Sequence, residues 1–337
     1  MHTSPPVTTP TNWRYLGPIF VAVGACLWGT ETLYRVHLNH RFSADLLVFY
    51  EHLFILAVML PVLVTQWRGI LGHSRRAYVF LTFSGILGSA LGGYTFTKGL
   101  GLMAPTAANL LLNVQPVFGA LMAYFLLREK ISRAFPLWAG LCLLVGAALS
   151  VKHVGDLWQG NTLLGMAYIV ATAFCWGVST AFGRGALLEI PPMAAAGARL
   201  LVGTLSIYIL CLVQGQPPSL AEFDEILATA PAMLQGGLLS ASLFKDFLLL
   251  ALFAGAMPLV FYYKGLSHTP ASVSAFCEML QTVAALVVTW GVLGDALVPH
   301  QMVAAVVLLF AVIRLNAAQQ AANVELADAA PTLSGAH

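Results

Sequence analysis

Long apolar stretches, joined by short polar connections, follow one another along almost the whole chain. Within each stretch the apolar residues are continuous and do not alternate with polar ones, which favours membrane helices over the strands of an outer-membrane barrel. A membrane helix needs roughly 20 mostly apolar residues. Ten stretches meet this requirement: 16–37, 44–65, 77–100, 104–127, 134–151, 162–183, 192–213, 246–266, 270–293 and 298–315.

Three longer regions lie outside these spans. Residues 1–15 are polar and rich in proline, and residues 316–337 are rich in alanine with a few charges, so we predict a cytoplasmic tail at each end. The one long connection, 214–245, contains an acidic cluster and a mildly apolar piece. Because Pro231 interrupts that piece, we expect a helix lying on the membrane surface there and not an eleventh span.

The composition excludes an ordinary soluble protein. Of the 337 residues, 59% are hydrophobic and only 9% are charged, against roughly 25% charged in soluble domains. The net charge of +2 and the scattered basic residues give no reason to expect nucleic acid as a partner. The five cysteines lie within apolar runs and lack metal-ligand spacing, so we expect neither a metal site nor a cofactor.

The distribution of lysine and arginine sets the orientation of the predicted spans. With the N-terminus in the cytoplasm, nine basic residues fall at cytoplasmic ends and four at outer ends. This excess satisfies the positive-inside rule, and it predicts a bacterial inner-membrane protein with both termini in the cytoplasm. The nine residues are Arg14, Arg68, Arg75, Arg76, Arg128, Lys130, Arg133, Arg184 and Arg314.

The two halves of the chain repeat one another. A shift of 148 residues relates the early parts of the halves, and a shift of 166 relates the later parts, because the connection 214–245 lengthens the second half. The matched positions are Trp28-Gly29 with Trp176-Gly177, Glu51 with Arg199, Lys98-Gly99-Leu100 with Lys264-Gly265-Leu266, Gln115 with Gln281, and Glu129 with Asp295. Each unit, 16–151 and 162–315, holds five spans, and an odd number inserts the second unit upside down.

Two five-helix units with these motifs resemble the EamA family of the drug/metabolite transporter superfamily. Each unit has Trp-Gly in its first helix, a fourth helix that begins at Pro105 or Pro270, and an acidic residue after that helix, in Leu-Arg-Glu (127–129) and Leu-Gly-Asp (293–295). The resemblance covers residues 16–315 and implies an all-α transporter of ten helices with a central cavity. Such transporters usually export small metabolites or amino acids.

Ionisable side chains inside a span cost about 2.5–3.5 kcal/mol each at a helix centre, so each one is a candidate for function. In the first unit, Glu31, Glu51 and His52 lie in the outer part of the membrane by this topology. We expect them to form an outer vestibule with Trp28 and Tyr50. Trp28 precedes Glu31 by three positions, so the ring and the carboxylate share one face of a helix.

The second unit mirrors this arrangement from the cytoplasmic side. Arg199 and Glu278 both lie roughly 10 Å from the cytoplasmic ends of their spans at 1.5 Å per residue. Asn109 and Asn113 are four residues apart on one helix face, where their amides can line a wet cavity. The remaining candidates for substrate binding or coupling are Lys98, Gln115, Trp176 and Gln281.

Structural roles compete with these functional ones. Arg35 follows Glu31 by four positions, which is the favourable orientation for a local ion pair. Arg199 can pair with Glu278 and serve only stability. Lys98 lies near a span end, from which a lysine can reach the headgroups.

We therefore expect a secondary transporter that exports a small polar or amphipathic metabolite by alternating access. Carboxylates favour an amine and Arg199 favours a carboxylate, so an amino acid or related zwitterion suits both; proton coupling through Glu51 and His52 is a hypothesis. The chain has no HExxH, Walker-type or GxSxG motif, so we do not expect an enzyme. Alternatives are uptake, movement of a choline-like amine, a membrane-embedded transferase, and a structural or sensor subunit. The expected partners are the substrate, the lipid bilayer and protons, and the sequence leaves a homodimer open.

Overall fold

A computed structural model describes residues 13–103, 108, 111–151, 163–236, 242–293 and 297–329. All regular elements in these ranges are helices. Eight helical segments are long and apolar enough to span a membrane, and two shorter apolar helices, Gln115–Leu127 and Phe135–Leu149, accompany them. The predicted fold class is confirmed: the chain is an all-α, multi-pass membrane protein.

The helices follow the predicted spans closely. Those of the first half are α1 (Trp13–Trp28), α2 (Glu31–Asn39), α3 (Ala44–Gln66), η1 (Trp67–Ile70), α4 (Arg75–Gly85), η2 (Ile86–Leu91), α5 (Gly92–Leu100), α7 (Gln115–Leu127) and α8 (Phe135–Ser150). Those of the second half are α9 (Leu163–Ala186), α10 (Pro192–Val213), α11 (Leu220–Ala228), α12 (Ala230–Gly236), α13 (Leu243–Leu249), η5 (Leu250–Ala256), α14 (Met257–Leu266), α15 (Ala271–Cys277), α16 (Leu280–Leu293) and α17 (Pro299–Ala329).

Several spans are interrupted in the same way in both halves. The third span of each half contains a π-helical segment, η2 in one and η5 in the other. The fourth span of each half breaks at a turn, at residues 113–114 and at 278–279. The first span also breaks, at residues 29–30, between α1 and α2. Such breaks and π segments release backbone groups and often mark functional sites in membrane transporters.

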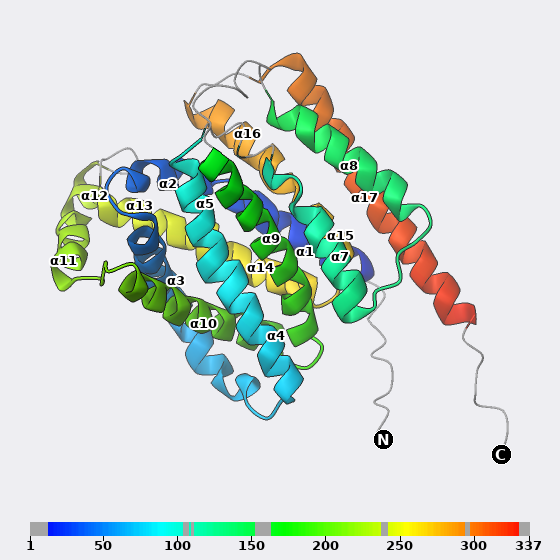
Figure 1. The fold of residues 1–337 in the computed structure, drawn as a ribbon, viewed down its shortest axis with the longest axis horizontal. Helices are drawn as coiled ribbons and strands as arrows, with labels where there is room; N and C mark the ends of the chain where they lie inside the picture. The colour runs from blue at the N-terminus through cyan, green and yellow to red at the C-terminus, as the bar shows by residue number, and fades with distance from the viewer. Residues whose placement is uncertain are drawn as a thin grey trace.

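The packing of the helices is reciprocal, as an inverted repeat requires. Helix α1 packs along α14, and its counterpart α9 packs along α4 and α5. Helices α3 and α10 pack on each other, and α8 and α17 form a pair at the edge of the bundle (Figure 1). The first span of each half therefore packs against the third and fourth spans of the other half. This reciprocal packing is that of the two-repeat transporter fold.

Close contacts at glycine show the same symmetry in atomic detail. A Cβ on Gly29 would lie 2.6 Å from the carbonyl oxygen of Gln281, and one on Gly177 would lie 2.5 Å from that of Gln115. The two glycines and the two glutamines are the repeat-related pairs of the sequence. The glycine of each Trp-Gly motif thus lets the first helix of one half touch the broken fourth span of the other half.

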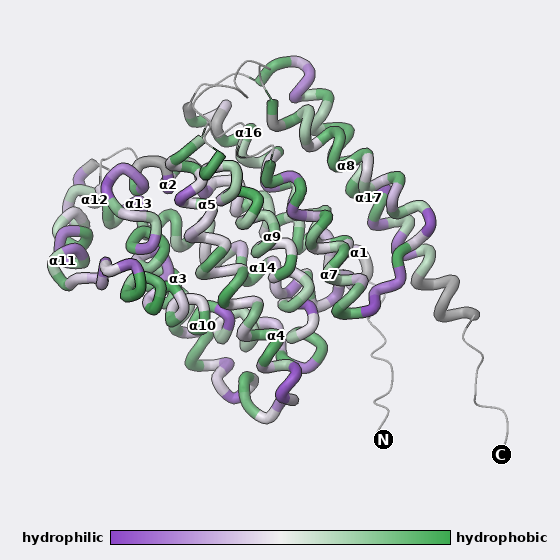
Figure 2. Tube along the Cα trace, in the orientation of Figure 1, coloured by the Kyte–Doolittle hydropathy of each residue, from purple (hydrophilic) through white to green (hydrophobic). Residues whose placement is uncertain are grey.

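The exterior is apolar, as contact with lipid requires. Large hydrophobic side chains such as Val64, Phe125 and Leu144 are about 70% exposed. In Figure 2, hydrophilic residues gather at the connection before α4 and around α11 to α13, and hydrophobic residues cover much of the spans. The long connection forms the short helices α11 and α12, separated at Thr229, and neither is long enough to span a membrane.

The C-terminal helix extends beyond the predicted span. Helix α17 continues to Ala329, so residues 316–329 are helical where a tail was expected. Alanine, glutamine, leucine and glutamate in this stretch are strong helix formers. Gln319 fixes it to the connection between α7 and α8, because its amide donates to the Lys130 carbonyl oxygen at 2.5 Å and accepts from the Ser132 N–H at 3.0 Å.

The acidic residue of the Leu-Arg-Glu motif caps a helix of the other half. The Glu129 carboxylate accepts hydrogen bonds from the backbone N–H groups of Ala271 and Ser272 at 2.7 and 3.0 Å, and from the Ser272 hydroxyl at 2.7 Å. These donors lie in the first turn of α15, where backbone N–H groups lack helical partners. The motif therefore joins the end of one fourth span to the start of the other.

The contact at Gly177 gives a stability prediction. Gly177→Ala forces a methyl group against the backbone at Gln115, and such overpacking costs about 1–3 kcal/mol. We expect a lower Tm for the detergent-purified variant than for the wild type. Gly140→Ala in α8 is the matched control, because a Cβ there meets no atom within 4 Å. Equal Tm values for the two variants would show that the close approach carries no strain.

Candidate functional site

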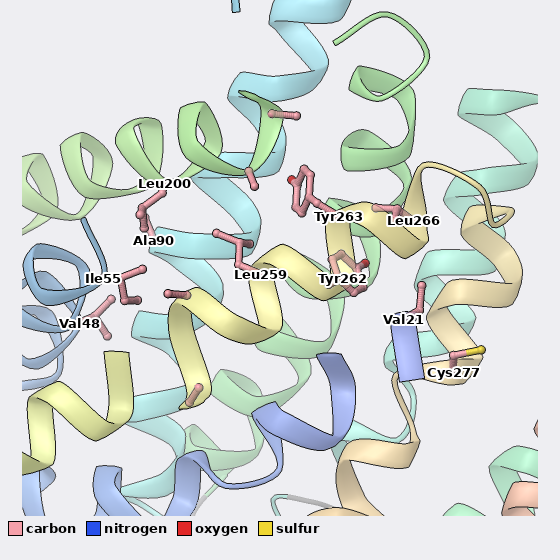
Figure 3. Close-up of a cluster of buried hydrophobic side chains, with 14 of the residues drawn as sticks. Val21, Val48, Ile55, Ala90, Leu200, Leu259, Tyr262, Tyr263, Leu266 and Cys277 are labelled. Atoms are coloured by element: carbon pink, nitrogen blue, oxygen red, sulfur yellow. The ribbon is translucent and has the colours of Figure 1, made fainter. Parts of the chain in front are cut away.

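A cavity of about 120 Å³ lies between the two halves of the chain. Its apolar wall includes Ile55, Leu200 and Leu259, which Figure 3 shows together with Tyr262 and Tyr263 of α14. Its polar and aromatic lining comes from both halves: Trp28, Glu31, Arg35, Glu51, His52, Gln115, Trp176, Ser179, Thr180, Arg199, Tyr262, Glu278 and Gln281. Three carboxylates and two guanidinium groups thus line one cavity.

Arg35 joins two of these carboxylates. Its Nη2 donates to both oxygens of Glu51, at 2.8 and 2.9 Å, and also contacts Glu31. Its Nη1 donates to the Thr97 hydroxyl at 2.8 Å. The i,i+4 pair of Glu31 and Arg35 expected from the sequence is present. Sequence reasoning offered no cation for Glu51 apart from neighbouring His52, and in the structure Arg35 of the preceding span pairs with it.

The cluster lies directly after the break between α1 and α2. Glu31 is the first residue of α2, where a carboxylate is favoured by the unpaired N–H groups of the first helical turn. All three ionisable side chains are at least 90% buried. Since one guanidinium faces two carboxylates, the cluster carries one uncompensated negative charge when both are ionised.

His52 is not paired with Glu51. Its Nδ1 lies 2.8 Å from the Val48 carbonyl oxygen, and a carbonyl can only accept, so Nδ1 carries the proton in this contact. In the neutral ring Nε2 is then a hydrogen-bond acceptor. His52 lines the cavity, and its Nε2 lies towards Gly203 of α10, where an added Cβ would be 3.4 Å from it.

Glu278 is held by three neutral donors. Its carboxylate accepts from the Gln115 amide at 2.5 Å, the Thr180 hydroxyl at 2.9 Å and the Tyr262 hydroxyl at 2.7 Å. Glu278 lies in the break of the fourth span of the second half, and Gln115 begins α7 directly after the corresponding break in the first half. The two interruptions therefore meet at one carboxylate.

Arg199 faces the cavity without an ion-pair partner. It is 8% exposed, and no carboxylate of the described residues lies within 4.0 Å of it. Its guanidinium carbon lies 5.5 Å from the centre of the Tyr263 ring, and its Nε has no hydrogen-bond partner. The purely structural pair with Glu278 weighed from the sequence is therefore not formed here.

The structure brings together most of the residues selected from the sequence. Nine of them line the cavity: Trp28, Glu31, Glu51, His52, Gln115, Trp176, Arg199, Glu278 and Gln281. The sequence assigned Glu31, Glu51 and His52 to an outer vestibule and Arg199 and Glu278 to the opposite side. In the structure all five line one cavity, to which both halves contribute.

Three selected residues do not line this cavity, and a fourth is not described by the structure. Tyr50 donates to Glu222 at 2.8 Å and to the Ser219 carbonyl oxygen at 3.0 Å, so it anchors α11 and does not line the cavity. Lys98 lies 5.9 Å from the centre of the Tyr94 ring, and Asn113 donates to the Gly146 carbonyl oxygen at 2.9 Å beside a smaller adjoining cavity. Asn109 lies outside the described residues.

Sequence reasoning missed three polar lining residues of the second half, Ser179, Thr180 and Tyr262. Scanning for ionisable groups cannot find them, because hydroxyl groups are common in membrane helices. Thr180 follows Trp176 by four positions and so shares its helix face, which is the one sequence signal that places it at the cavity.

Comparisons with known proteins agree with this architecture. The sequence model of the EamA-like transporter family matches residues 15–151 and 163–317, so the chain belongs to this family. The protein is accordingly a membrane transporter of small metabolites.

Individual relatives are more distant. The riboflavin transporter ImpX of Fusobacterium nucleatum is 25% identical over 307 residues, which cover 89% of this chain and 97% of the relative. An uncharacterized transporter of Methanothermobacter thermautotrophicus is 24% identical over 144 residues, covering 42% of this chain and 41% of its own. One solved protein structure, 18% identical, superposes with a TM-score of 0.66 over 94% of this chain and all of its own, which shows the shared fold.

The cluster around Arg35 gives a second stability prediction. Arg35→Gln leaves two buried carboxylates without their cation, and breaking a buried ion pair from one side costs about 3–5 kcal/mol. We expect a marked loss of folded, monodisperse protein in detergent. The triple variant Arg35→Gln/Glu31→Gln/Glu51→Gln should regain part of that loss, because no buried charge is left unpaired. Arg41→Gln, at an exposed position, is the control. The ion pairs would be dispensable if Arg35→Gln behaved like Arg41→Gln.

Proposed function

We propose that the cavity is the substrate site of a secondary transporter that works by alternating access. Both inverted halves contribute charged and aromatic side chains to one enclosed space, and this observation carries the proposal. The transported solute is a small amphipathic metabolite, such as an amino acid or related zwitterion, and the direction is export. The protein lies in a bacterial inner membrane with both termini in the cytoplasm, and the units 16–151 and 162–315 move against each other.

A flat heteroaromatic solute is the second candidate. One relative, which aligns with this chain over 97% of its own length, is named as a riboflavin transporter. Trp28, Trp176 and Tyr262 supply aromatic surfaces at the cavity on which a ring system can pack. These rings suit a solute with a planar ring system, whichever of the two candidate classes it belongs to.

Transport can be measured directly in sealed vesicles. We expect purified protein in proteoliposomes to move at least one solute from a panel of labelled amino acids and riboflavin. Glu278→Gln should slow that movement at least tenfold, because it replaces the carboxylate that holds the two broken spans together. Glu225→Gln, at an exposed position of α11, is the matched control.

The same assay separates the alternatives. A panel solute that crosses outward identifies an exporter, and one that crosses inward identifies an importer. Turnover of a solute in detergent, without sealed compartments, would instead identify an enzyme. Absence of movement for the wild type, or equal rates for Glu278→Gln and wild type, would contradict the proposal.

Proton coupling is proposed to run through the cluster of Glu31, Arg35 and Glu51. One proton neutralises its remaining negative charge, and a buried charge is costly unless it is compensated. The charged and titratable groups near this cluster at the cavity are His52, Arg199 and Glu278. Glu31 thus joins Glu51 as a proposed proton carrier. His52 lies near the cluster but does not itself carry the exchanged proton.

An imposed pH gradient tests this coupling. In vesicles we expect the wild-type rate to rise severalfold when the gradient drives protons against the solute. Glu31→Gln should remove that response while exchange of labelled for unlabelled solute continues, because the neutral side chain no longer carries a proton. Glu222→Gln, in α11 away from the cavity, should keep the response. A wild-type rate that ignores the gradient would exclude proton coupling.

A further inference from the structure

The charged groups of the cavity differ in how completely they are compensated. Arg35 is saturated by two carboxylates and the Thr97 hydroxyl. Glu278 already accepts three hydrogen bonds. Arg199, in contrast, donates no hydrogen bond to a described residue although it is 92% buried and lines the same space. Among these groups, Arg199 is therefore the one whose hydrogen-bond donors are unused by the described residues.

The surroundings of Arg199 keep its guanidinium at the cavity. A Cβ on Gly88 would collide with Nη2 of Arg199 and with the Ser179 hydroxyl, so the glycine in η2 leaves the space that the guanidinium occupies. The centre of the Tyr263 ring lies 5.5 Å from the guanidinium carbon of Arg199. A planar guanidinium held in this way presents parallel N–H groups, the geometry that matches a carboxylate.

The rest of the lining suits an apolar or aromatic body. Leu200, which follows Arg199 in sequence, and Leu259 belong to the apolar wall of the cavity, and the Trp28 and Tyr262 rings lie 4.9 Å apart between centres. An amine meets carboxylates that already accept hydrogen bonds from Arg35 or from three neutral donors. A carboxylate on a ring thus suits both the unused donors of Arg199 and the apolar and aromatic surface.

We propose that Arg199 binds the carboxylate of the transported solute, so that the chain selects organic anions with an aromatic or apolar body over the corresponding amides and amines. The proposal rests on the proposed function in taking this cavity as the solute's site. It narrows the solute class, since a carboxylate is required and an amino group is not.

Three compounds with the same ring and different head groups test this selectivity. Binding of indole-3-acetate, indole-3-acetamide and tryptamine to the purified wild type is measured by isothermal titration calorimetry. We expect indole-3-acetate to bind at least tenfold more tightly than the other two. Failure to bind indole-3-acetate, or equal affinity for the amide or the amine, would overturn the proposal.

Variants at position 199 tie the selectivity to the guanidinium. Arg199→Gln should weaken indole-3-acetate binding at least tenfold and leave the amide within twofold, and Arg199→Lys should retain part of the preference because it keeps the charge but loses the planar fork. Lys264→Gln, which removes an exposed cation of α14, is the matched control. If Arg199→Gln does not fold, Arg199→Lys and Gly88→Ala are tested in its place. We expect each of them to bind indole-3-acetate at least threefold more weakly than the wild type. Unchanged selectivity in the folded variants would overturn the proposal.

Binding and transport fail in different ways. If indole-3-acetate binds through Arg199 but no solute crosses sealed vesicles, the assignment of Arg199 stands and the transport proposal fails. If solutes cross the vesicles at rates that Arg199→Gln leaves unchanged, transport stands and the role of Arg199 is wrong.

Discussion

A charge buried within a membrane must be compensated on site, and Arg35 does this for the first half of the chain. Its guanidinium contacts Glu31 of α2, Glu51 of α3 and Thr97 of α5, so one side chain joins three successive spans. Glu31 and Arg35 form an i,i+4 pair within α2, which begins directly after the break of the first span at residues 29–30. That break lies where Gly29 touches the Gln281 backbone of the other half. The charge cluster, the broken helix and the contact between halves are therefore next to one another.

The inverted repeat explains why the cavity lies where it does. Each Trp-Gly glycine approaches the broken fourth span of the other half, and each tryptophan of the motif lines the cavity next to that contact. The symmetry of the backbone is not matched by symmetry of charge. Glu51 and Arg199 occupy equivalent positions in the second span of each half, and they carry opposite charges into the same space. A symmetric frame thus presents an asymmetric surface to a solute.

The sequence predicted the frame well and the contacts less well. Spans, repeat and glycine-containing motifs follow from apolar continuity and internal matches, because lipid requires closed helices and long apolar runs. The ionisable, amide and tryptophan side chains selected within the spans also included nine that line the cavity. The pairing of Glu51 with Arg35 could not be derived, since it depends on how two spans rotate and where the first one breaks. Tyr50 shows the same limit: its position beside Glu51 suggested a vestibule, but its ring points to the other side of α3, where its hydroxyl anchors α11.

The contrast between Arg35 and Arg199 relates structure to transport. A saturated cation holds its helices together in every state in which its partners stay in place, because moving it would expose two buried carboxylates. An unsaturated cation has the opposite property: its interaction free energy becomes available only when a solute with an acceptor group arrives. A ligand can shift a conformational equilibrium only by its difference in affinity between the states. The group whose bonding changes on binding is thus the one able to couple solute to movement, and among the cavity's cations that group is Arg199.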